Sequence, residues 1–221
     1  TGIEVVGYNR SQGILRELAD QEGIIPAGSL EEVVQRLSPP RVVWLMLPSG
    51  APTSQAVDTL TGLLAKGDIV VDGGNSNYHD SLRHGAVLAE HGIGFADAGT
   101  SGGIWGLKEG YCLMVGGTPQ VLRELEPALK ALAPAPDHGW AHVGPAGAGH
   151  FTKMIHNGIE YGMMQAFAEG FDIMKNRASD KLPADERFDL NLADIAEVWR
   201  RGSVVTSWLL DLTADALAKD G

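Results

Sequence analysis

Short apolar runs alternate with helical patterns along the first two thirds of the chain, and this alternation limits the possible folds more than any other feature. The runs lie at residues 3–8, 41–47, 68–72, 92–98 and 111–117. The first three are apolar and β-branched almost without interruption, which is typical of strands buried on both faces of a parallel sheet. Strand–helix alternation of this kind predicts an α/β, doubly wound domain.

Helical patterns lie between these runs, at about 11–22, 29–37, 53–65 and 79–91. Two of the predicted helices carry clear start signals. Ser29 is followed three residues later by Glu32, which is the spacing of a capping box. Thr118 is followed by Pro119, and proline is favoured at the first helical position because the N–H that it lacks has no partner there.

The pattern changes near residue 148, and from there on only helical patterns occur. The first runs from 149 to about 176, and after a polar segment two more follow at 191–200 and 203–219. The sequence therefore predicts a Rossmann-like domain at 1–148, followed by an all-helical domain at 149–221.

Composition excludes two classes of partner. The formal net charge is -11 and the basic residues are scattered, whereas a nucleic-acid-binding protein carries a basic stripe. No apolar run approaches the roughly 18 residues that would span a membrane.

The single cysteine, Cys112, can form no internal disulfide, which suits a reducing compartment, so we expect a cytoplasmic protein. Its apolar neighbours predict a buried side chain.

The helical pattern that begins at 149 carries an unusual polar stripe. Lys153, His156, Asn157, Glu160 and Tyr161 follow the spacing i, i+3, i+4, i+7 and i+8, which places them on one side of a helix. Apolar residues lie outside the stripe, namely Met154, Ile155, Ile159, Met163, Ala166 and Phe167. We therefore expect this helix to be packed on most sides and to line a cleft with the polar one. A lysine or glutamate whose pKa is shifted by burial can act as an acid or base. A solvent-facing stripe is the alternative, although His, Asn and Tyr are unusual choices for solubility.

Two glycine-rich segments follow predicted strands. In "VDGGNSNYHDS" (71–81) the glycines permit a sharp turn at the carboxyl end of the sheet, where ligands bind in open α/β folds, and Asn75 would face that crevice. A simple strand–helix turn explains this segment equally well. "DAGTSGGIWGLKEG" (97–110) can offer backbone N–H groups and Ser101 to a ligand oxyanion.

The segment "VVGYNRS" (5–11) ends a predicted strand with Asn9, Arg10 and Ser11. In a dinucleotide-binding fold the end of the second strand meets the adenosine ribose. An acidic residue there selects NAD, whereas Arg accommodates the 2′-phosphate of NADP. Taken alone, the segment is better explained by a surface arginine and a serine that caps a helix.

Together these segments resemble the 6-phosphogluconate dehydrogenase family, the decarboxylating enzymes of the pentose phosphate pathway and of gluconate utilization. "GAGHFTKMIHNGIEYGMMQ" is similar to the catalytic helix of that family, and "VDGGNSNYHDS" and "DAGTSGGIWGLKEGYCLMVGG" to its other substrate segments. "EVWRRGSVVTSWLLDLTADAL" resembles the short bacterial form more than the long form. The likeness extends over nearly the whole chain.

The resemblance implies a role for each matching residue. Lys153 would be the general base for the 3-hydroxyl while hydride passes to NAD or NADP, and Glu160 would protonate C1 of the enediol after CO₂ leaves. The cofactor would lie against Asn9, Arg10, Ser11 and Asn75. The phosphorylated sugar acid would be bound by Asn75, Ser101, Gly102, Gly103, His156, Asn157 and Tyr161. The resemblance implies no metal, because the lysine polarises the carbonyl.

Two departures accompany this resemblance. "TGIEVVGYNRS" aligns with the second strand of the family, so the first strand, its G-x-G-x-x-G turn and the helix after it are not in this sequence. Thr206 stands where the long form has a phosphate-binding arginine, and the residue that replaces that arginine is left open.

Arg10 favours NADP over NAD. The apolar "SVVTSWLLDLTADALA" leads us to expect a homodimer.

Two alternatives stay open at this point. A related β-hydroxyacid dehydrogenase would act on a small unphosphorylated acid and would not be expected to carry His156, Glu160 and Tyr161 together. A non-catalytic remnant of the fold would keep the cleft and would show no turnover.

Overall fold

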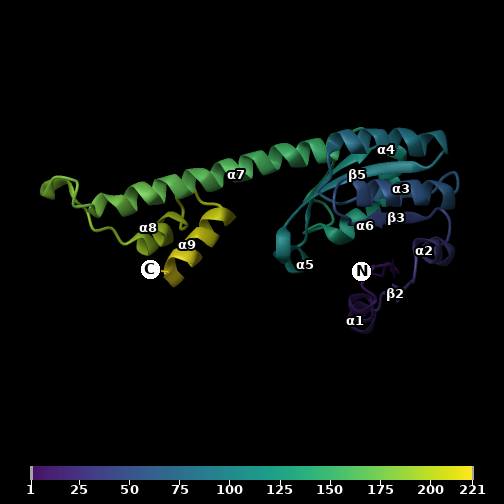
Figure 1. Cartoon of the computed structure of the whole chain (residues 1–221), viewed down its shortest axis with the longest axis horizontal. Coiled ribbons are helices and arrows are strands. Elements are labelled where there is room, and N and C mark those ends of the chain that lie inside the picture. Colours follow the sequence, from purple (N-terminus) through teal and green to yellow (C-terminus); the bar gives the residue numbers. More distant parts are fainter. Residues whose placement is uncertain (1, 221) are drawn as a thin grey trace. The chain divides into compact units, whose positions relative to one another are not determined.

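The computed structural model describes residues 2–220 and divides the chain into two compact units, Thr1–Met154 and Ile155–Gly221 (Figure 1). The division falls inside one long helix, α7 (Ala148–Lys175). The sequence boundary at 148 marks the first residue of this helix. No helix in the described part of the chain is both long and apolar enough to cross a membrane.

Unit 1 contains two sheets. The strands are β1 (Val6–Gly7), β2 (Ile25–Pro26), β3 (Val42–Leu45), β4 (Ile69–Asp72), β5 (Gly94–Ser101), β6 (Cys112–Gly117) and β7 (Trp140–Gly144). The β1 and β2 strands pair in parallel with each other, and the other five form a sheet in the order β3-β4-β5-β6-β7. Neighbouring strands of the larger sheet run parallel to each other, except β5 and β6. These two are consecutive in the chain and run antiparallel.

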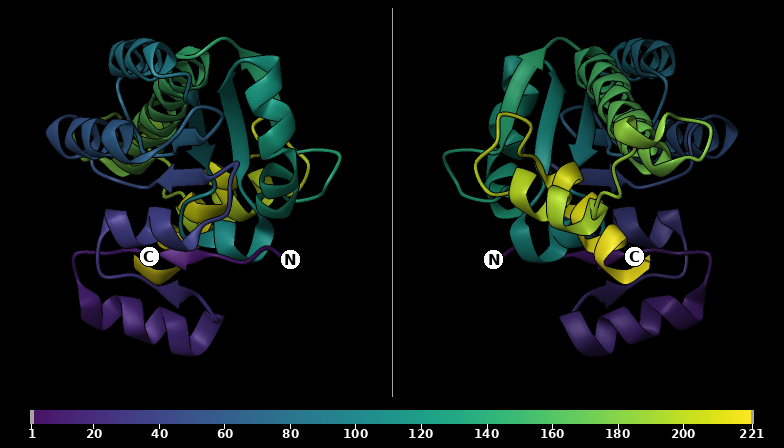
Figure 2. Two further views of the ribbon diagram at one scale, coloured as in Figure 1. Left: turned by 90° about the vertical axis from the view of Figure 1, so that its right-hand side faces the viewer. Right: turned by 90° about the vertical axis from the view of Figure 1, so that its left-hand side faces the viewer.

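Helices cover both faces of the five-stranded sheet (Figures 1 and 2). The helices and short 3₁₀ turns of unit 1 are α1 (Gln12–Glu22), α2 (Leu30–Arg36), α3 (Ala51–Leu63), α4 (Tyr78–Glu90), η1 (Gly103–Trp105), α5 (Gly106–Glu109) and α6 (Pro119–Leu132). On one face, Leu60 of α3 and Leu88 of α4 pack with Val70 and Phe95 of the sheet. On the other face, α6 packs against alternate residues of the same strands. The prediction of a doubly wound domain is confirmed.

The predicted helix starts are observed, with one difference. The Ser29 hydroxyl accepts a hydrogen bond from Glu32 N at 3.2 Å, but the Glu32 carboxylate reaches back to Gly28 N rather than to Ser29 N. The Thr118 hydroxyl accepts from Val121 N at 3.3 Å, and Pro119 occupies the first turn of α6.

Several elements were not foreseen or differ in length. β2 has two residues, one of them a proline, and so short a strand leaves no periodic signal. The first strand covers only Val6–Gly7 of the predicted 3–8. The prediction of a buried cysteine was wrong: Cys112, the first residue of β6, is exposed.

A buried carboxylate joins the loops at the amino end of β4. Asp68 is 1% exposed, and it accepts hydrogen bonds from Arg41 N at 2.7 Å and Ala65 N at 2.9 Å, with the Arg41 guanidinium 3.0 Å away. Burial by itself would raise the pKa of Asp68, but the bonds from Ala65 and Arg41 outweigh it and lower that pKa.

The first turns of α7 lie directly on the backbone of β5 and β6, because glycines stand at the points of approach. A Cβ at Gly149 would lie 2.5 Å from Met114 O and would also collide with Asp97 O. A Cβ at Gly116 would lie 2.8 Å from Gly149 N, and one at Gly99 would lie 2.5 Å from Lys153 Cβ. These approaches explain why glycine stands at all three positions, one in α7 and one in each strand beneath it.

Unit 2 has its own small core. Its elements after α7 are η2 (Asn176–Ala178), η3 (Ala184–Glu186), α8 (Leu192–Trp199) and α9 (Trp208–Asp220). Phe171, Ala196, Leu210 and Ala214 form the buried centre of this core. The all-helical prediction for this part is confirmed, but α9 begins later than the predicted 203.

The prediction that α7 is packed on most sides was wrong for its middle turns. Ile155, Ile159 and Met163 are exposed. The reason is that the core of unit 2 engages only the last turns of α7, through residues such as Phe167 and Phe171.

We expect Gly149→Ala to destabilise the chain by roughly 3 kcal/mol or more, because the added methyl group would meet backbone atoms that cannot move aside. Gly158→Ala is the matched control on the same helix, because a Cβ there meets nothing within 4 Å. It should stabilise the chain by about 0.5–1 kcal/mol through helix propensity. Urea unfolding monitored by circular dichroism measures both changes. Equal effects of the two substitutions would contradict this account.

Candidate active site

Lys153 is a buried lysine at the end of unit 1. The residue is 9% exposed and lies on α7, one turn after the helix start. Its Cβ and Cγ lie against Gly99 of β5, where a Cβ would come within 2.5 Å and 3.3 Å of them. Because Gly99 has no side chain, β5 leaves space there for the stem of Lys153.

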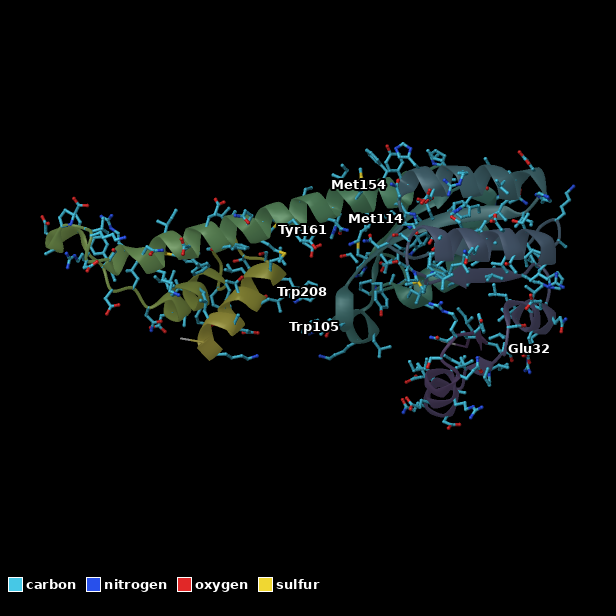
Figure 3. All side chains as sticks on the ribbon, viewed as in Figure 1. Glu32, Trp105, Met114, Met154, Tyr161 and Trp208 are labelled. Carbon is cyan, nitrogen blue, oxygen red and sulfur yellow. The ribbon has the colours of Figure 1, made fainter. Side chains whose placement is uncertain are left out.

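Ser101 ends β5, two residues beyond Gly99 on the same side of the strand. Gly102 and Gly103 follow with φ values of 141° and 53°, a left-handed region that favours glycine. The chain then forms η1 and α5, from which Trp105 projects (Figure 3). A backbone that turns sharply next to Ser101 can present N–H groups to a ligand.

The Asn75 loop follows β4 at the carboxyl edge of the same sheet. A Cβ at Gly74 would lie 2.6 Å from Leu47 O, so this loop lies against the loop after β3. Asn75 itself is exposed. Asp72 is fully buried and accepts a hydrogen bond from Gly74 N at 3.1 Å.

Two buried oxygen atoms beside Asn75 make no hydrogen bond within the described residues. They are Asp72 Oδ2 and Ser76 Oγ. Buried polar atoms usually have partners, so two such atoms at one sheet edge fit a site that receives a polar ligand. The dinucleotide that the sequence resemblance implies is of that kind.

The other predicted residues of α7 belong to unit 2. His156 Nδ1 lies 3.7 Å from Glu160 Oε2 and 3.3 Å from Asn157 Oδ1, so these three side chains lie together on one side of the helix. Tyr161 is next to them and is 69% exposed (Figure 3). An imidazole, an amide, a carboxyl group and a phenol can together bind a ligand rich in hydroxyl groups.

Three of the four residues predicted to meet the cofactor follow β1. Asn9 Oδ1 accepts a hydrogen bond from Ser11 N at 2.9 Å, which forms a tight turn into α1. Ser11 is the N-cap residue of α1, but its side chain makes no cap bond. Arg10 is exposed, and no ion pair involves it among residues 2–220. An exposed arginine of this kind can bind a phosphate group.

The sequence did not predict a buried polar cluster formed by Asp97, His150 and Ser81. Asp97 accepts hydrogen bonds from Gly147 N at 2.6 Å and from His150 N at 2.7 Å. His150 Nδ1 lies 2.7 Å from Ser81 Oγ. The only signal in the sequence was an acidic residue inside the apolar run at 92–98, and that signal alone does not reveal its partners.

A second buried histidine lies close to the Asn75 loop. His84 Nε2 lies 3.0 Å from Ser54 Oγ. Burial lowers the pKa of His84, and the nearby Arg83 guanidinium lowers it further, although Asp72 opposes this shift. The imidazole is therefore held in its neutral form at neutral pH.

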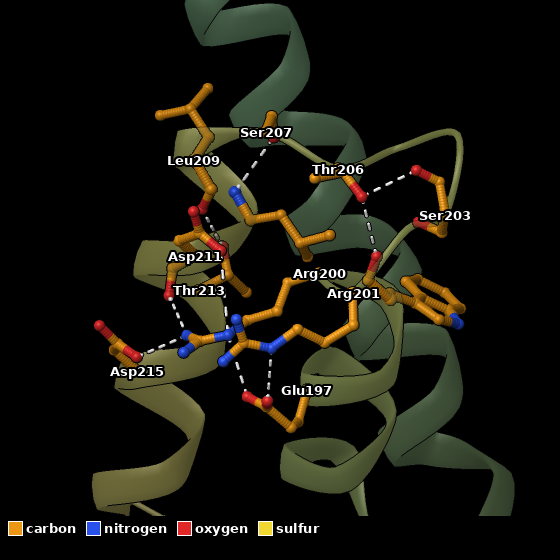
Figure 4. Close-up of polar contacts among 12 residues, drawn as sticks. Glu197, Arg200, Arg201, Ser203, Thr206, Ser207, Leu209, Asp211, Thr213 and Asp215 are labelled. Carbon is orange, nitrogen blue, oxygen red and sulfur yellow. Dashed lines mark hydrogen bonds and ion pairs between the residues drawn. The ribbon is translucent and has the colours of Figure 1, made fainter.

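Thr206 lies in the turn between α8 and α9. Its hydroxyl lies 2.8 Å from Ser203 O and 3.2 Å from Trp199 O, so it closes this turn and delays the start of α9 (Figure 4).

Arg200 lies beside this turn and is surrounded by carboxylates, with Asp215 at 2.7 Å, Glu197 at 2.9 Å and Asp211 at 3.8 Å (Figure 4). Hydrogen bonding to Asp215 raises the pKa of this guanidinium. Because its charge is matched within unit 2, Arg200 holds α8 to α9.

Two protein-family models match this chain. The model of the NAD binding domain of 6-phosphogluconate dehydrogenase matches residues 1–144, and that of the C-terminal domain of the same enzyme matches 149–183. An NAD(+)-dependent, decarboxylating 6-phosphogluconate dehydrogenase of Haloferax volcanii is 40% identical over 220 residues, which are 100% of this chain and 69% of that protein.

Solved structures of two dehydrogenases are similar to this chain. Plasmodium falciparum 6-phosphogluconate dehydrogenase, studied with NADP+ and with 6-phosphogluconate, is 28% identical with a TM-score of 0.86, and the match covers 100% of this chain and 47% of that one. Mycobacterium tuberculosis 3-hydroxyisobutyrate dehydrogenase is 24% identical with a TM-score of 0.73, and covers 99% of this chain and 78% of that one. The second likeness shows the shared fold alone.

Proposed function

The chain belongs to the 6-phosphogluconate dehydrogenase family, and we propose that it converts 6-phosphogluconate to ribulose 5-phosphate and CO₂ with NAD or NADP. At the coarser level, membership of this family makes the chain an oxidoreductase. The observation that carries the finer proposal is the buried Lys153 against Gly99, on the same helix as His156 and Glu160.

In the proposed reaction Lys153 acts first as a base. It takes the proton of the 3-hydroxyl group as C3 is oxidised to a ketone. The protonated amine then donates a hydrogen bond to the new carbonyl oxygen, which stabilises the negative charge that develops there when the C1–C2 bond breaks. As CO₂ leaves, the amine gives its proton to this oxygen, and an enediol remains.

Glu160 then supplies a proton to C1 of the enediol, the carbon that was C2 of 6-phosphogluconate. Lys153 takes back the proton of the enediol hydroxyl group, which gives the ketose product. A carboxylic acid can do this if it is protonated at that stage of the reaction. His156 Nδ1 lies 3.7 Å from Glu160 Oε2, so a small side-chain movement would allow it to hydrogen-bond to this carboxyl group. Asn157 and Tyr161 are proposed to hold the substrate's hydroxyl and phosphate groups.

NAD or NADP, when bound, supplies the hydride acceptor. Asn9, Arg10 and Ser11 are the residues proposed to hold its adenosine end, and Asn75 its nicotinamide end. The two buried oxygen atoms beside Asn75 support a polar ligand at this edge. Arg10, exposed and without an ion pair among the described residues, supports NADP.

The two alternative hypotheses about function have less support. The 3-hydroxyisobutyrate dehydrogenase likeness is one of fold, and the grouping of His156 with Glu160 favours a substrate that needs a proton donor at C1. A non-catalytic remnant would give no reason for a lysine to be buried beside Gly99.

We expect Lys153→Met to lower kcat for 6-phosphogluconate oxidation roughly a thousandfold or more, because it removes the group that moves the proton. Formation of reduced nicotinamide, followed by absorbance with NADP and with NAD, measures the rate. Lys130→Met is the control, since Lys130 forms an exposed ion pair with Glu126 on α6. Equal rates for Lys153→Met and the unaltered chain would contradict the lysine's role. No turnover by the unaltered chain would contradict the activity itself.

We expect Arg10→Ala to lower kcat/KM for NADP about tenfold or more, because a charge-assisted hydrogen bond to the 2′-phosphate contributes about 1.5–3 kcal/mol. The value for NAD should stay within roughly a factor of two, since NAD lacks that phosphate. Arg16→Ala, on the exposed side of α1, should change neither value. An unchanged ratio of the two cofactors in Arg10→Ala would exclude this arginine from the phosphate site.

We also propose a homodimer, on the basis of apolar side chains exposed on unit 2. Val198 is 69% exposed, Val204 is fully exposed and Trp208 is 48% exposed. Light scattering at micromolar concentration should give twice the chain mass of 23.4 kDa. Val204→Asp should shift the protein toward the monomer, because it places a charge on this surface. A monomeric unaltered chain would rule out the dimer.

A further inference from the structure

Three buried polar side chains tie α4, β5 and the start of α7 together. They are Ser81, Asp97 and His150, and none is more than 2% exposed. Ser81 Oγ and His150 Nδ1 are 2.7 Å apart, and Asp97 Oδ2 accepts from His150 N at 2.7 Å. Each residue comes from a different element, so the cluster fixes how these elements meet.

Asp97 acts on the start of α7 through its charge. Its two oxygens accept hydrogen bonds from Gly147 N and His150 N, at 2.6 Å and 2.7 Å. Such N–H groups have no partner within the helix itself, and they form its positive end. A carboxylate from a neighbouring strand therefore holds the first turn of α7 in one position.

Lys153 comes three residues after His150, so it lies on the next turn of the same rigid helix. Its stem lies against Gly99, which is two residues after Asp97 and points to the same side of β5. The strand thus contacts α7 twice, through the carboxylate at the helix start and through the glycine at the lysine.

We propose that Asp97, supported by His150 and Ser81, is a positioning residue that sets the location of the Lys153 amine. Its importance for catalysis rests on the function proposed above, whereas its effect on the location of Lys153 does not. A displacement of about 1 Å in a reacting group can cost roughly a hundredfold in rate, so this placement matters for the reaction.

Asp68 offers a matched control for a merely structural role. It too is a buried carboxylate that accepts two backbone N–H bonds, but it lies at the amino end of β4 and bonds to Arg41 and Ala65. Asp97 pairs in register with Asp72, at the other end of that strand. A general loss of stability should therefore appear in both Asp97→Asn and Asp68→Asn, but a displaced lysine only in the first.

The test compares these two variants with the unaltered chain at a temperature where melting curves show all three folded. Acetic anhydride acylates lysine amines, and mass spectrometry reads the rate at Lys153 relative to the exposed Lys130 of the same molecule. In Asp97→Asn we expect this ratio to rise about tenfold, because the first turns of α7 open more often. In Asp68→Asn it should stay within about twofold of the unaltered chain.

Turnover gives the second measurement. In Asp97→Asn, kcat for 6-phosphogluconate oxidation should fall roughly 10- to 100-fold while KM for the dinucleotide changes little. If the unaltered chain shows no turnover, the proposed function fails, and the acylation ratio still decides the positioning role.

An unchanged acylation ratio in Asp97→Asn would overturn the inference, and so would equal rises in both variants. Should Asp97→Asn fail to fold, Ser81→Ala decides, since it removes one hydroxyl and leaves the charge in place. A raised ratio at Lys153 in that variant supports the inference, and an unchanged ratio overturns it.

Discussion

A carboxylate removed from water needs partners, and for Asp97 these are backbone N–H groups at the start of a long helix. The rest of unit 1 is arranged around this requirement. The sheet supplies Asp97 from β5, and the next residues on the same side of that strand are Gly99 and Ser101. One strand therefore fixes the helix, leaves space for Lys153 and ends in a serine that can face a ligand.

The proposed chemistry depends on this order of elements. A base must be held where the substrate's hydroxyl group will lie, and a lysine on a flexible loop would seldom be there. Here the lysine follows directly from a helix start that is fastened by charge and by close backbone approach. The polar residues farther along α7 form their own group, in which His156 and Glu160 face each other.

The sequence predicted what depends on local patterns. Apolar runs located the strands, Ser29 and Thr118 located helix starts, and the spacing from Lys153 onward identified one side of a helix. It did not predict contacts between distant segments. The bond between Ser81 and His150 joins residues 69 positions apart, and no local pattern records it. Exposure was also misjudged, for Cys112 and for Ile159, because it depends on which neighbours each side chain meets.

The glycines beneath α7 restrict how this protein can change in evolution. A tight contact between two side chains can be relieved by making the partner smaller. At Gly149 the atoms in the way are the carbonyl oxygens of Asp97 and Met114 and the amide nitrogen of Gly116, which every residue type at those positions would carry. No second mutation can therefore compensate for a larger residue there, and this position is closed to drift for as long as the helix lies on this sheet.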